Sequence, residues 1–551
     1  MNPMRKLLLS AVALLIACNL YPAGLVTNTN QSAAWVRMPA RNASTGIDAV
    51  YYNPAGLTKL DDGFHISISN QFISQKKTVM NYYTGPNGTT GLNNPKFVGD
   101  VSAPFFPGVY AAYKKNKIAI SIGVNPVGGG GSAEYKTGLP SFELGISDLV
   151  PALASQGATG YKLSSYLNGK SVYLGLQAGV SYKLSDAVSV AVGLRYVMAK
   201  NTYKGHLTGI QLNMAGDWLP ASTVLTGVVN NLTAITAIPT SLAPIISGGA
   251  GGYTLSQLVS GSIINQATSD QISAALAYLG LTPATIAAMT TTQISGAITT
   301  ATPTLQAKIA TYTATASLLQ DQTADVTQTG SGVSPIFSIN ISPSQNFDIA
   351  IKYEMRTKMN IKNDTKADFT TGFTTLGVPI TMFPDKAVTP SDMPALLSIG
   401  LHMKASDKIA IYLGSDYFFD KDANYGHKIN DAFVPNSQII SSNGIDLSGG
   451  LEVSLSEKLL VSAGYLWANK GVSNLYQSDL TYANATSTIG FGGTYAILKN
   501  LKLTLGGSIT LYQMDTQYPD HVYAATGQVF NPKETHTKDT WLLGAGLDFN
   551  F

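Results

Sequence analysis

The chain has 551 residues, a net charge of +3 and a composition that is unusual for a soluble protein. Only 12% of its residues are charged, against about 25% in ordinary globular chains, and it holds 53 glycines and 28 tyrosines. The small net charge, without a basic stripe or a phosphate-binding glycine loop, argues against nucleic acid as a partner. No run of about 18 apolar residues follows the N-terminal region, which leaves a closed β-barrel as the way to cross a bilayer.

Residues 1–23 have the pattern of a signal peptide. A basic pair precedes an apolar run at 7–17, which has the length of a signal-peptide core and is too short to span a bilayer. We predict cleavage after Ala23, which would leave a mature chain without cysteine. Cleavage before Cys18, at a sequence similar to a bacterial lipobox, is the alternative. Both patterns predict export.

Residues 24–62 lack the alternation of a strand and contain the stretch YYNPAGL. Pro54 fixes its φ angle, Asn53 can bond its own backbone in a turn, and Ala55 and Gly56 allow another part of the chain to approach closely. An ordinary loop before the first strand would explain the proline and the glycine, but not about 40 residues without alternation. These residues predict a compact, kinked segment before the first strand.

Residues 63–551 show the period of two that is expected for transmembrane β-strands. Near the C-terminus, for example, Trp541, Leu543 and Leu547 share one face, while the opposite face is small or polar. A soluble β-sandwich would show the same inward face, but the few charges and many aromatic residues favour lipid. Six short polar turns and seven longer loops predict fourteen strands with both chain ends in the periplasm. The predicted strands are 63–76, 104–114, 116–126, 171–183, 187–203, 334–343, 346–361, 394–404, 407–420, 442–455, 458–469, 485–497, 500–514 and 539–551.

The third predicted strand ends in Asn125 and Pro126, followed after Val127 by four glycines. Pro126 cannot donate a ladder hydrogen bond and consecutive glycines hold a strand poorly, so pairing with the neighbouring strand should fail here. Alternatively, these residues only begin an external loop. The candidate opening in the wall comprises Asn125, Pro126, Gly128 and Gly129.

The segment 205–332 departs from the strand pattern, because it is long, nearly uncharged and punctuated like a helical region. Ser269 is a candidate N-cap, and Pro283 and Pro303 are candidate first residues of further helices. A short apolar helix on an extracellular loop either packs on its neighbours as a structural lid or offers an apolar surface for a ligand. Both readings remain open. The candidate capture surface comprises Ile272, Leu276 and Leu279.

Cations on inward faces are the candidate contacts for an acidic ligand. Arg195, Lys352, Arg356 and Lys358 all fall on the predicted lumen side. A buried carboxylate needs ionic or hydrogen-bonding partners, and these four residues are the candidates for binding it. The alternative is an ion-pair network in which Glu354 satisfies these cations.

The stretch TNTNQSAAWVRMPARNASTGIDAVYYNPAGLTKL (27–60), the fourteen predicted strands and the terminal Phe551 together resemble the FadL-type outer-membrane transporters of long-chain fatty acids and other hydrophobic compounds. The resemblance covers essentially the whole mature chain. It implies that residues 24–62 form an N-terminal plug, the hatch, which contains the Asn-Pro-Ala motif. It also implies that a kink in the third strand opens the wall sideways and that extracellular loops first capture the ligand.

The sequence therefore predicts an all-β, fourteen-stranded outer-membrane barrel of a Gram-negative bacterium that works as a passive channel. We expect its partners to be long-chain fatty acids or other hydrophobic small molecules and the surrounding outer-membrane lipids, and we expect a monomer. No cofactor, metal or catalytic residue is predicted, because no motif links His65 or His402 to a nucleophile. The alternatives are a surface receptor or adhesin that uses the large loop, and an outer-membrane lipid hydrolase.

Overall fold

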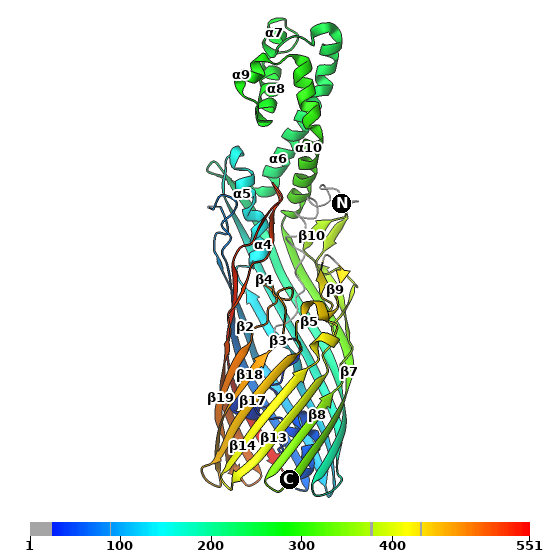
Figure 1. The fold of residues 1–551 in the computed structure, drawn as a ribbon, viewed down its shortest axis with the longest axis vertical. Coiled ribbons are helices and arrows are strands. Elements are labelled where there is room, and N and C mark those ends of the chain that lie inside the picture. The colour runs from blue at the N-terminus through cyan, green and yellow to red at the C-terminus, as the bar shows by residue number, and fades with distance from the viewer. Residues whose placement is uncertain (1–24, 89, 375–377, 430–431) are drawn as a thin grey trace.

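Fourteen antiparallel strands close into a barrel, as predicted (Figure 1). The computed structural model describes residues 25–551 except 89, 375–377 and 430–431, so the predicted signal peptide lies outside the described residues. Each barrel strand pairs with the next, and the last pairs with the first. The barrel strands are β1 (Gly63–Asn81), β2 (Lys96–Lys115), β3 (Ile118–Tyr135), β4 (Ala158–Lys183), β5 (Val188–Met214), β7 (Gln322–Ser344), β8 (Phe347–Glu354), β13 (Leu396–Ser406), β14 (Ile409–Phe418), β17 (Gly444–Ser454), β18 (Leu459–Asn469), β19 (Thr486–Leu498), β20 (Leu501–Tyr512) and β24 (Glu534–Asn550).

The outer surface of the barrel carries an apolar belt. On β3, for example, Ile118, Ile120 and Ile122 alternate outward and are about half exposed, whereas Ser121 faces the lumen and is buried. A soluble sandwich would bury such a face, so the alternation is that of a barrel that meets lipid. Even-numbered antiparallel barrels of this kind are the outer-membrane type.

The connections alternate as expected. All six predicted short turns join neighbouring strands, and the C-terminus lies at the end of the barrel that carries these turns (Figure 1). At the other end several strands continue beyond their predicted limits: the predictions 171–183, 187–203 and 334–343 were too short for β4, β5 and β7. These outer extensions lack the lipid-facing alternation, because their outward residues meet water instead of lipid.

A helical projection stands on the loop between β5 and β7 (Figure 1). Its two long helices, α6 (Ala221–Ile245) and α10 (Thr291–Leu318), pack side by side, and Asp270 and Lys308 are its only charged residues between 221 and 318. The stretch 221–250 is long and apolar enough to cross a membrane by composition, but it belongs to this projection. The shorter elements of this loop are β6 (Asp217–Pro220), η3 (Ile246–Ala250), α7 (Leu255–Ser260), α8 (Gln266–Tyr278) and α9 (Pro283–Ala288).

The helix boundaries correct part of the sequence reading. Asn265 and not Ser269 is the N-cap of α8, because its side chain accepts the N–H of Thr268. Pro283 begins α9 as predicted, whereas Pro303 lies inside α10. A capping box at the start of α10 lets that helix begin twelve residues before Pro303.

Smaller elements build the outer mouth of the barrel. They are α4 (Pro140–Ser147), α5 (Leu149–Ala152), η2 (Ala154–Gln156), β9 (Asn360–Ala367), β10 (Thr370–Phe373), β11 (Pro379–Thr381), β12 (Val388–Pro390), η4 (Asp420–Asp422), β15 (Lys428–Ile429), β16 (Ala432–Phe433), α11 (Asn436–Ile439), β21 (Asp515–Gln517), β22 (His521–Tyr523) and β23 (Gln528–Phe530). Among them, α4 and the loop that follows β18 close over the cavity described below.

The hatch fills the lumen with three short helices, α2 (Ala33–Arg37), α3 (Ala49–Tyr52) and η1 (Pro54–Lys59), and nearly all of its residues are buried. The wall that faces it is lined by glycines. A Cβ atom added to Gly506 would lie 2.7 Å from the backbone nitrogen of Arg37, and one added to Gly490 would lie 2.5 Å from the carbonyl oxygen of Val36. The hatch backbone therefore touches the wall only because the wall carries no side chains there.

This contact predicts that Gly506→Ala disturbs the hatch without preventing barrel assembly, since overpacking by one methyl group costs about 1–3 kcal/mol. The hatch should become sensitive to protease in the folded, heat-modifiable barrel. Gly507→Ala is the matched control, because a Cβ there meets only ordinary contacts at 3.6 Å and beyond. Equal protease resistance in the two variants would contradict this account of the fit.

Candidate functional site

The Asn-Pro-Ala motif fastens the hatch to the barrel wall. The Asn53 side-chain amide donates to the carbonyl of Ser44 within the hatch and to Asn340 on β7. The carbonyl of Pro54 accepts from Ser181, and that of Ala55 accepts from Ser189. Each polar group that the turn exposes thus finds a partner, as burial requires.

Gly56 explains why this turn is so tight. A Cβ atom at this position would lie 2.5 Å from the Asn53 side-chain nitrogen and 2.7 Å from the carbonyl oxygen of Ser44. The sequence prediction of close packing by the YYNPAGL stretch therefore has a specific geometric cause. An ordinary loop before the first strand does not describe this segment.

Two of the predicted ligand cations contact the hatch instead of an open cavity. Arg195 pairs with Glu354 at 2.5 Å, and Lys352 pairs with the same carboxylate at 2.6 Å. The Tyr51 ring lies 4.9 Å from the Arg195 guanidinium and 4.5 Å from the Lys352 ammonium, and its carbonyl accepts from Lys352. This is the ion-pair network that the sequence left open, with an aromatic ring of the hatch between its two cations.

A second charged network was not predicted. Arg37 and Arg41 of the hatch both reach Glu452 on β17, and Arg41 also pairs with Asp48. The regular alternation of β17 places Glu452 inward, but the two arginines lie in a segment without periodicity. No sequence pattern predicts which wall residue these two arginines contact.

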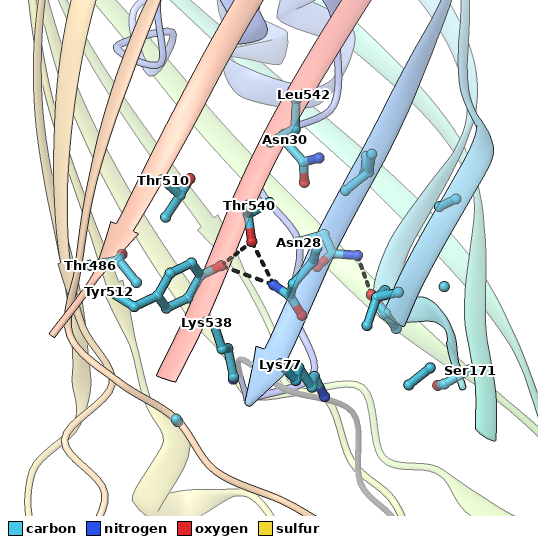
Figure 2. A pocket seen from close by; sticks show the side chains of 18 of the residues that line it. Asn28, Asn30, Lys77, Ser171, Thr486, Thr510, Tyr512, Lys538, Thr540 and Leu542 are labelled. Atoms are coloured by element: carbon cyan, nitrogen blue, oxygen red, sulfur yellow. Dashed lines mark hydrogen bonds between the residues drawn. The ribbon is translucent and has the colours of Figure 1, made fainter. Parts of the chain in front are cut away.

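A cavity of about 280 Å³ lies in the lumen on the outer side of the hatch. Figure 2 shows side chains that line it. Hatch residues 27–30 and Trp35 contribute to its lining, and polar and apolar wall residues complete it. Its size is at the lower end of typical ligand pockets. The apolar part includes Ile73, Val101, Phe106, Leu167, Leu466 and Leu542.

Two lysines face this cavity from adjacent strands. Lys77 on β1 and Lys538 on β24 are register partners, and both are buried (Figure 2). The Lys538 ammonium donates to the carbonyl of Tyr482 and lies 4.5 Å from its ring centre.

Like charges directly opposite each other on paired strands repel. Over the described residues neither lysine has a salt bridge, since the nearby Glu534 is bound to Asn81 and His536. An anionic group placed between Lys77 and Lys538 would pair with both ammonium groups and remove the repulsion between them.

Sequence reasoning missed this lysine pair. The first strand was predicted to stop at residue 76, one residue before Lys77, although the alternation of His65, Ser67, Ser69 and Gln71 continues inward through that position. The last strand was predicted to start at 539, directly after Lys538. Extending both strands by one residue at the outer end would have revealed the pair.

The wall beside the cavity is broken between β2 and β3. Their pairing stops at Ser102 and resumes at Val109, so residues 103–108 of β2 and 125–131 of β3 do not pair with each other. Prolines on both sides lack the N–H that a ladder requires. The break adjoins the cavity, because Ala103, Phe106, Gly129 and Gly131 line it. β3 nevertheless continues to Tyr135, so the reading in which the glycines only begin a loop is wrong.

The first hatch residues occupy the place of the missing strand neighbour. The Asn28 N–H donates to the carbonyl of Val127, and its side chain donates to the carbonyl of Gly129. Gln31 donates to the carbonyl of Pro126 and accepts from Asn125. The kinked part of β3 is therefore hydrogen-bonded to the hatch and not to β2.

The solved structures that resemble this chain share its architecture. The crystal structure of a Pseudomonas aeruginosa FadL homologue matches over 96% of this chain and 99% of its own, with a TM-score of 0.54 at 11% sequence identity. The chain has the FadL fold. The Pseudomonas putida toluene transporter TodX (12% identity, 97% and 99% coverage, TM-score 0.49) and the Ralstonia pickettii toluene transporter TbuX (13%, 97% and 99%, 0.47) are also similar. No protein-family model and no curated protein sequence matches the chain.

Within this FadL fold the other predicted contacts lie away from the cavity. Arg356 donates to the carbonyl of Asp422, and Lys358 is exposed in a hollow on the outside of the wall. In the projection, Ile272 and Leu276 are buried in its own core and Leu279 is half-buried against it. These three residues do not form an exposed apolar surface, and their role in capturing a ligand stays a prediction.

The cover of the cavity depends on a carboxyl group whose charge is disfavoured. The Ser141 N–H of α4 donates to Asp479 at 2.9 Å, and the neighbouring Leu480 lines the cavity. Burial, together with repulsion from Glu534, raises the pKa of Asp479 to about 6. In this part of the FadL fold the protonated carboxyl group is therefore the predominant form only below about pH 6.

This raised pKa predicts that the cover loosens as the pH rises. The folded state binds the proton more tightly than the unfolded state, so the stability that Asp479 contributes is present below about pH 4 and is lost as the pH rises through about 6. Hydrogen exchange of residues 139–147, corrected for intrinsic rates, should lose about tenfold protection between pH 4.5 and 7. Asp479→Asn should flatten this profile, and an unchanged profile in that variant would refute the assignment.

Proposed function

We propose that the protein is an outer-membrane channel that takes up hydrophobic molecules, with long-chain fatty acids as its substrates. The observation that carries the proposal is the cavity, which joins three features: an apolar lining, an uncompensated lysine pair and a break in the wall. No energy-coupling motif is visible in the sequence, so transport runs down the concentration gradient.

The lysine pair favours an acid over a neutral hydrocarbon. A carboxylate held between Lys77 and Lys538 would gain two charge-assisted hydrogen bonds and remove the repulsion between the ammonium groups. The acyl chain would then extend along the apolar lining, past Phe106, towards the break. A neutral molecule of the same length would fill the same space but offer neither lysine an acidic partner.

Release through the wall avoids water. Moving an acyl chain into water costs about 0.8 kcal/mol per CH₂ group, whereas the break leads sideways from the cavity. The hatch closes this route, because residues 26–31 hold the kinked part of β3. Displacement of the hatch by an arriving ligand would free those hydrogen bonds and open the wall, in line with the predicted roles of Asn125, Pro126, Gly128 and Gly129.

The carboxylate site can be tested by removing its charges. In the double variant Lys77→Met and Lys538→Met, binding of palmitate should weaken at least about tenfold, while binding of hexadecanol changes little, because only the acid loses ionic partners. Titration calorimetry in neutral detergent measures both. Lys358→Met is the control, since this lysine lies outside the cavity. Equal losses for acid and alcohol would contradict the carboxylate role.

The exit can be tested by closing the break. A Cβ atom at Gly131 would lie 3.1 Å from that of Ala103. Disulfides need about 3.5–4.5 Å between these atoms, so cysteines at the two positions can be joined across the gap after the strands separate by a few tenths of an ångström. Gly131 has a φ of +76°, and the substitution costs about 1–2 kcal/mol of strain. Fatty-acid uptake by cells should fall severalfold when this bond is oxidised and recover on reduction, with palmitate binding retained in both forms. Undiminished uptake by the oxidised protein would exclude this exit.

A further inference from the structure

Lys358, which was predicted to face the lumen, lies on the outside of the barrel instead. β8 ends at Glu354 and β9 begins at Asn360, and between them the strand is interrupted. Thr357 and Met359 are buried inward, whereas Lys358 points outward and is exposed. Its cationic group is therefore available to a partner on the membrane side of the wall.

Lysines follow directly above the apolar belt on this side of the barrel. On β5 the exposed Met198 is followed outward by Lys200, and on the β8–β9 strand the exposed Met355 is followed by Lys358 and Lys362. The intervening strand β7 carries no bulky outward residue beyond Val333 at this level, since its next outward positions are serine and threonine. The lysines thus lie at the height where lipid headgroups begin.

The three lysines are also close together around the wall. Lys200 is the register partner of Thr329, and Thr329 is the register partner of Lys362. Two strand spacings separate Lys200 from Lys362, which is about 10 Å. Lys358 lies four residues before Lys362, which is about 13 Å along an extended strand, and its carbonyl approaches Gly332 of β7. Together they form a cationic group that we call the outer lysine cluster: Lys200, Lys358 and Lys362.

A hollow of about 590 Å³ opens beside the cluster on the outer wall. Lys358, Ser331, Asn360 and Asn424 line it with an ammonium, a hydroxyl and two amide groups. The acidic residue that lines it, Asp392, accepts the N–H groups of Met359 and Asn424, and its charge is offset by Arg356 at 3.8 Å. The ammonium, hydroxyl and amide donors of the hollow are not bound to this carboxylate and can serve an anion.

The nearby acidic residues do not neutralise the cluster. Asp364 on β9 is held by Lys386 at 3.2 Å, and Asp325 is the register partner of Lys204. None of the three cluster lysines has a salt bridge to any residue that the structure describes. On the other side of the barrel, by contrast, Lys76 lies between Asp100 and Asp539 on the two neighbouring strands.

We propose that the outer lysine cluster and its hollow bind the phosphorylated headgroup of a lipid in the outer leaflet. Phosphate is the anion found at this height of a membrane, and clusters of lysines at the interface attract anionic lipids. Ser331, Asn360 and Asn424 would donate to the phosphate oxygens, and the acyl chains would lie on the apolar belt around Met198, Val333 and Met355 below. This site is independent of the lumen cavity and of the proposed transport.

Native mass spectrometry of the full barrel in neutral detergent tests the site. The probe is a bisphosphorylated lipid A, compared with the same lipid after removal of its phosphates. The test variant is Lys200→Ser with Lys358→Ser and Lys362→Ser. The matched control removes three exposed lysines on the opposite side, Lys76→Ser with Lys96→Ser and Lys533→Ser. Heat-modifiable migration establishes that each barrel is folded before binding is measured.

The unaltered protein should bind the phosphorylated lipid at least about tenfold more tightly than the dephosphorylated one. The cluster variant should lose this preference, and the control variant should keep it within about twofold. Inorganic phosphate at millimolar concentration should not displace the lipid, because it cannot use the apolar belt. Equal binding of the two lipids, an unaltered preference in the cluster variant, or full displacement by free phosphate would each overturn the proposal.

Discussion

The close approach of the hatch backbone to the inner wall is the constraint on which the rest of this structure depends. Glycines at the contact points allow it, because a single added Cβ at Gly490 or Gly506 would collide with the backbone of α2. The hatch can then exchange hydrogen bonds with serines and asparagines of the wall. Its first residues, 26–31, form hydrogen bonds to the kinked strand beside the cavity. The glycines of the wall therefore allow the hatch to fit inside the barrel, and the fitted hatch covers the break in the wall beside the cavity.

Buried charge is used in two different ways in the lumen. Around the hatch, cations and carboxylates are matched, as where Glu452 meets Arg37 and Arg41, or where Glu354 meets Arg195 and Lys352. Removing one partner of such a network leaves an uncompensated charge, which is strongly destabilising. In the cavity, by contrast, Lys77 and Lys538 face each other without a salt bridge to any described residue, because the cavity's Asp446 pairs with Lys470. The matched networks stabilise the plug, and the unmatched pair has its charge available for something that arrives.

The predictability of this protein follows from the period of its strands. Lipid and lumen impose alternation on each strand, and short polar turns mark one end, so the fourteen strands and six turns could be read from the sequence. The periodicity fades above the membrane, where both faces of a strand are polar, and the outer limits of β4, β5 and β7 were missed for this reason. Lys77 and Lys538 lie just beyond the predicted strand ends.

Which cations are free could not be predicted, because that depends on partners far away in the sequence. Arg195 and Lys352 have the residue types and the inward orientation that a fatty-acid site would need. What distinguishes them from the cavity lysines is Glu354 on the same side of the wall, together with the Tyr51 ring supplied by the hatch. The alternation of a strand predicts whether a side chain faces the lumen or the lipid, but it does not predict which distant residues the side chain contacts.

The helical projection has a consequence for how the barrel can assemble. β5 and β7 are neighbours in the wall, yet residues 215–321 separate them, and the entropic cost of closing a flexible loop grows with its length. The contacts between α6 and α10 form one hairpin from a continuous stretch of chain, so it can form before any strand pairs across it. The base of that hairpin brings Leu207 and Gln322 together, where the β5–β7 ladder starts. A connection of more than a hundred residues then behaves, for the zipping of these two strands, like a short turn.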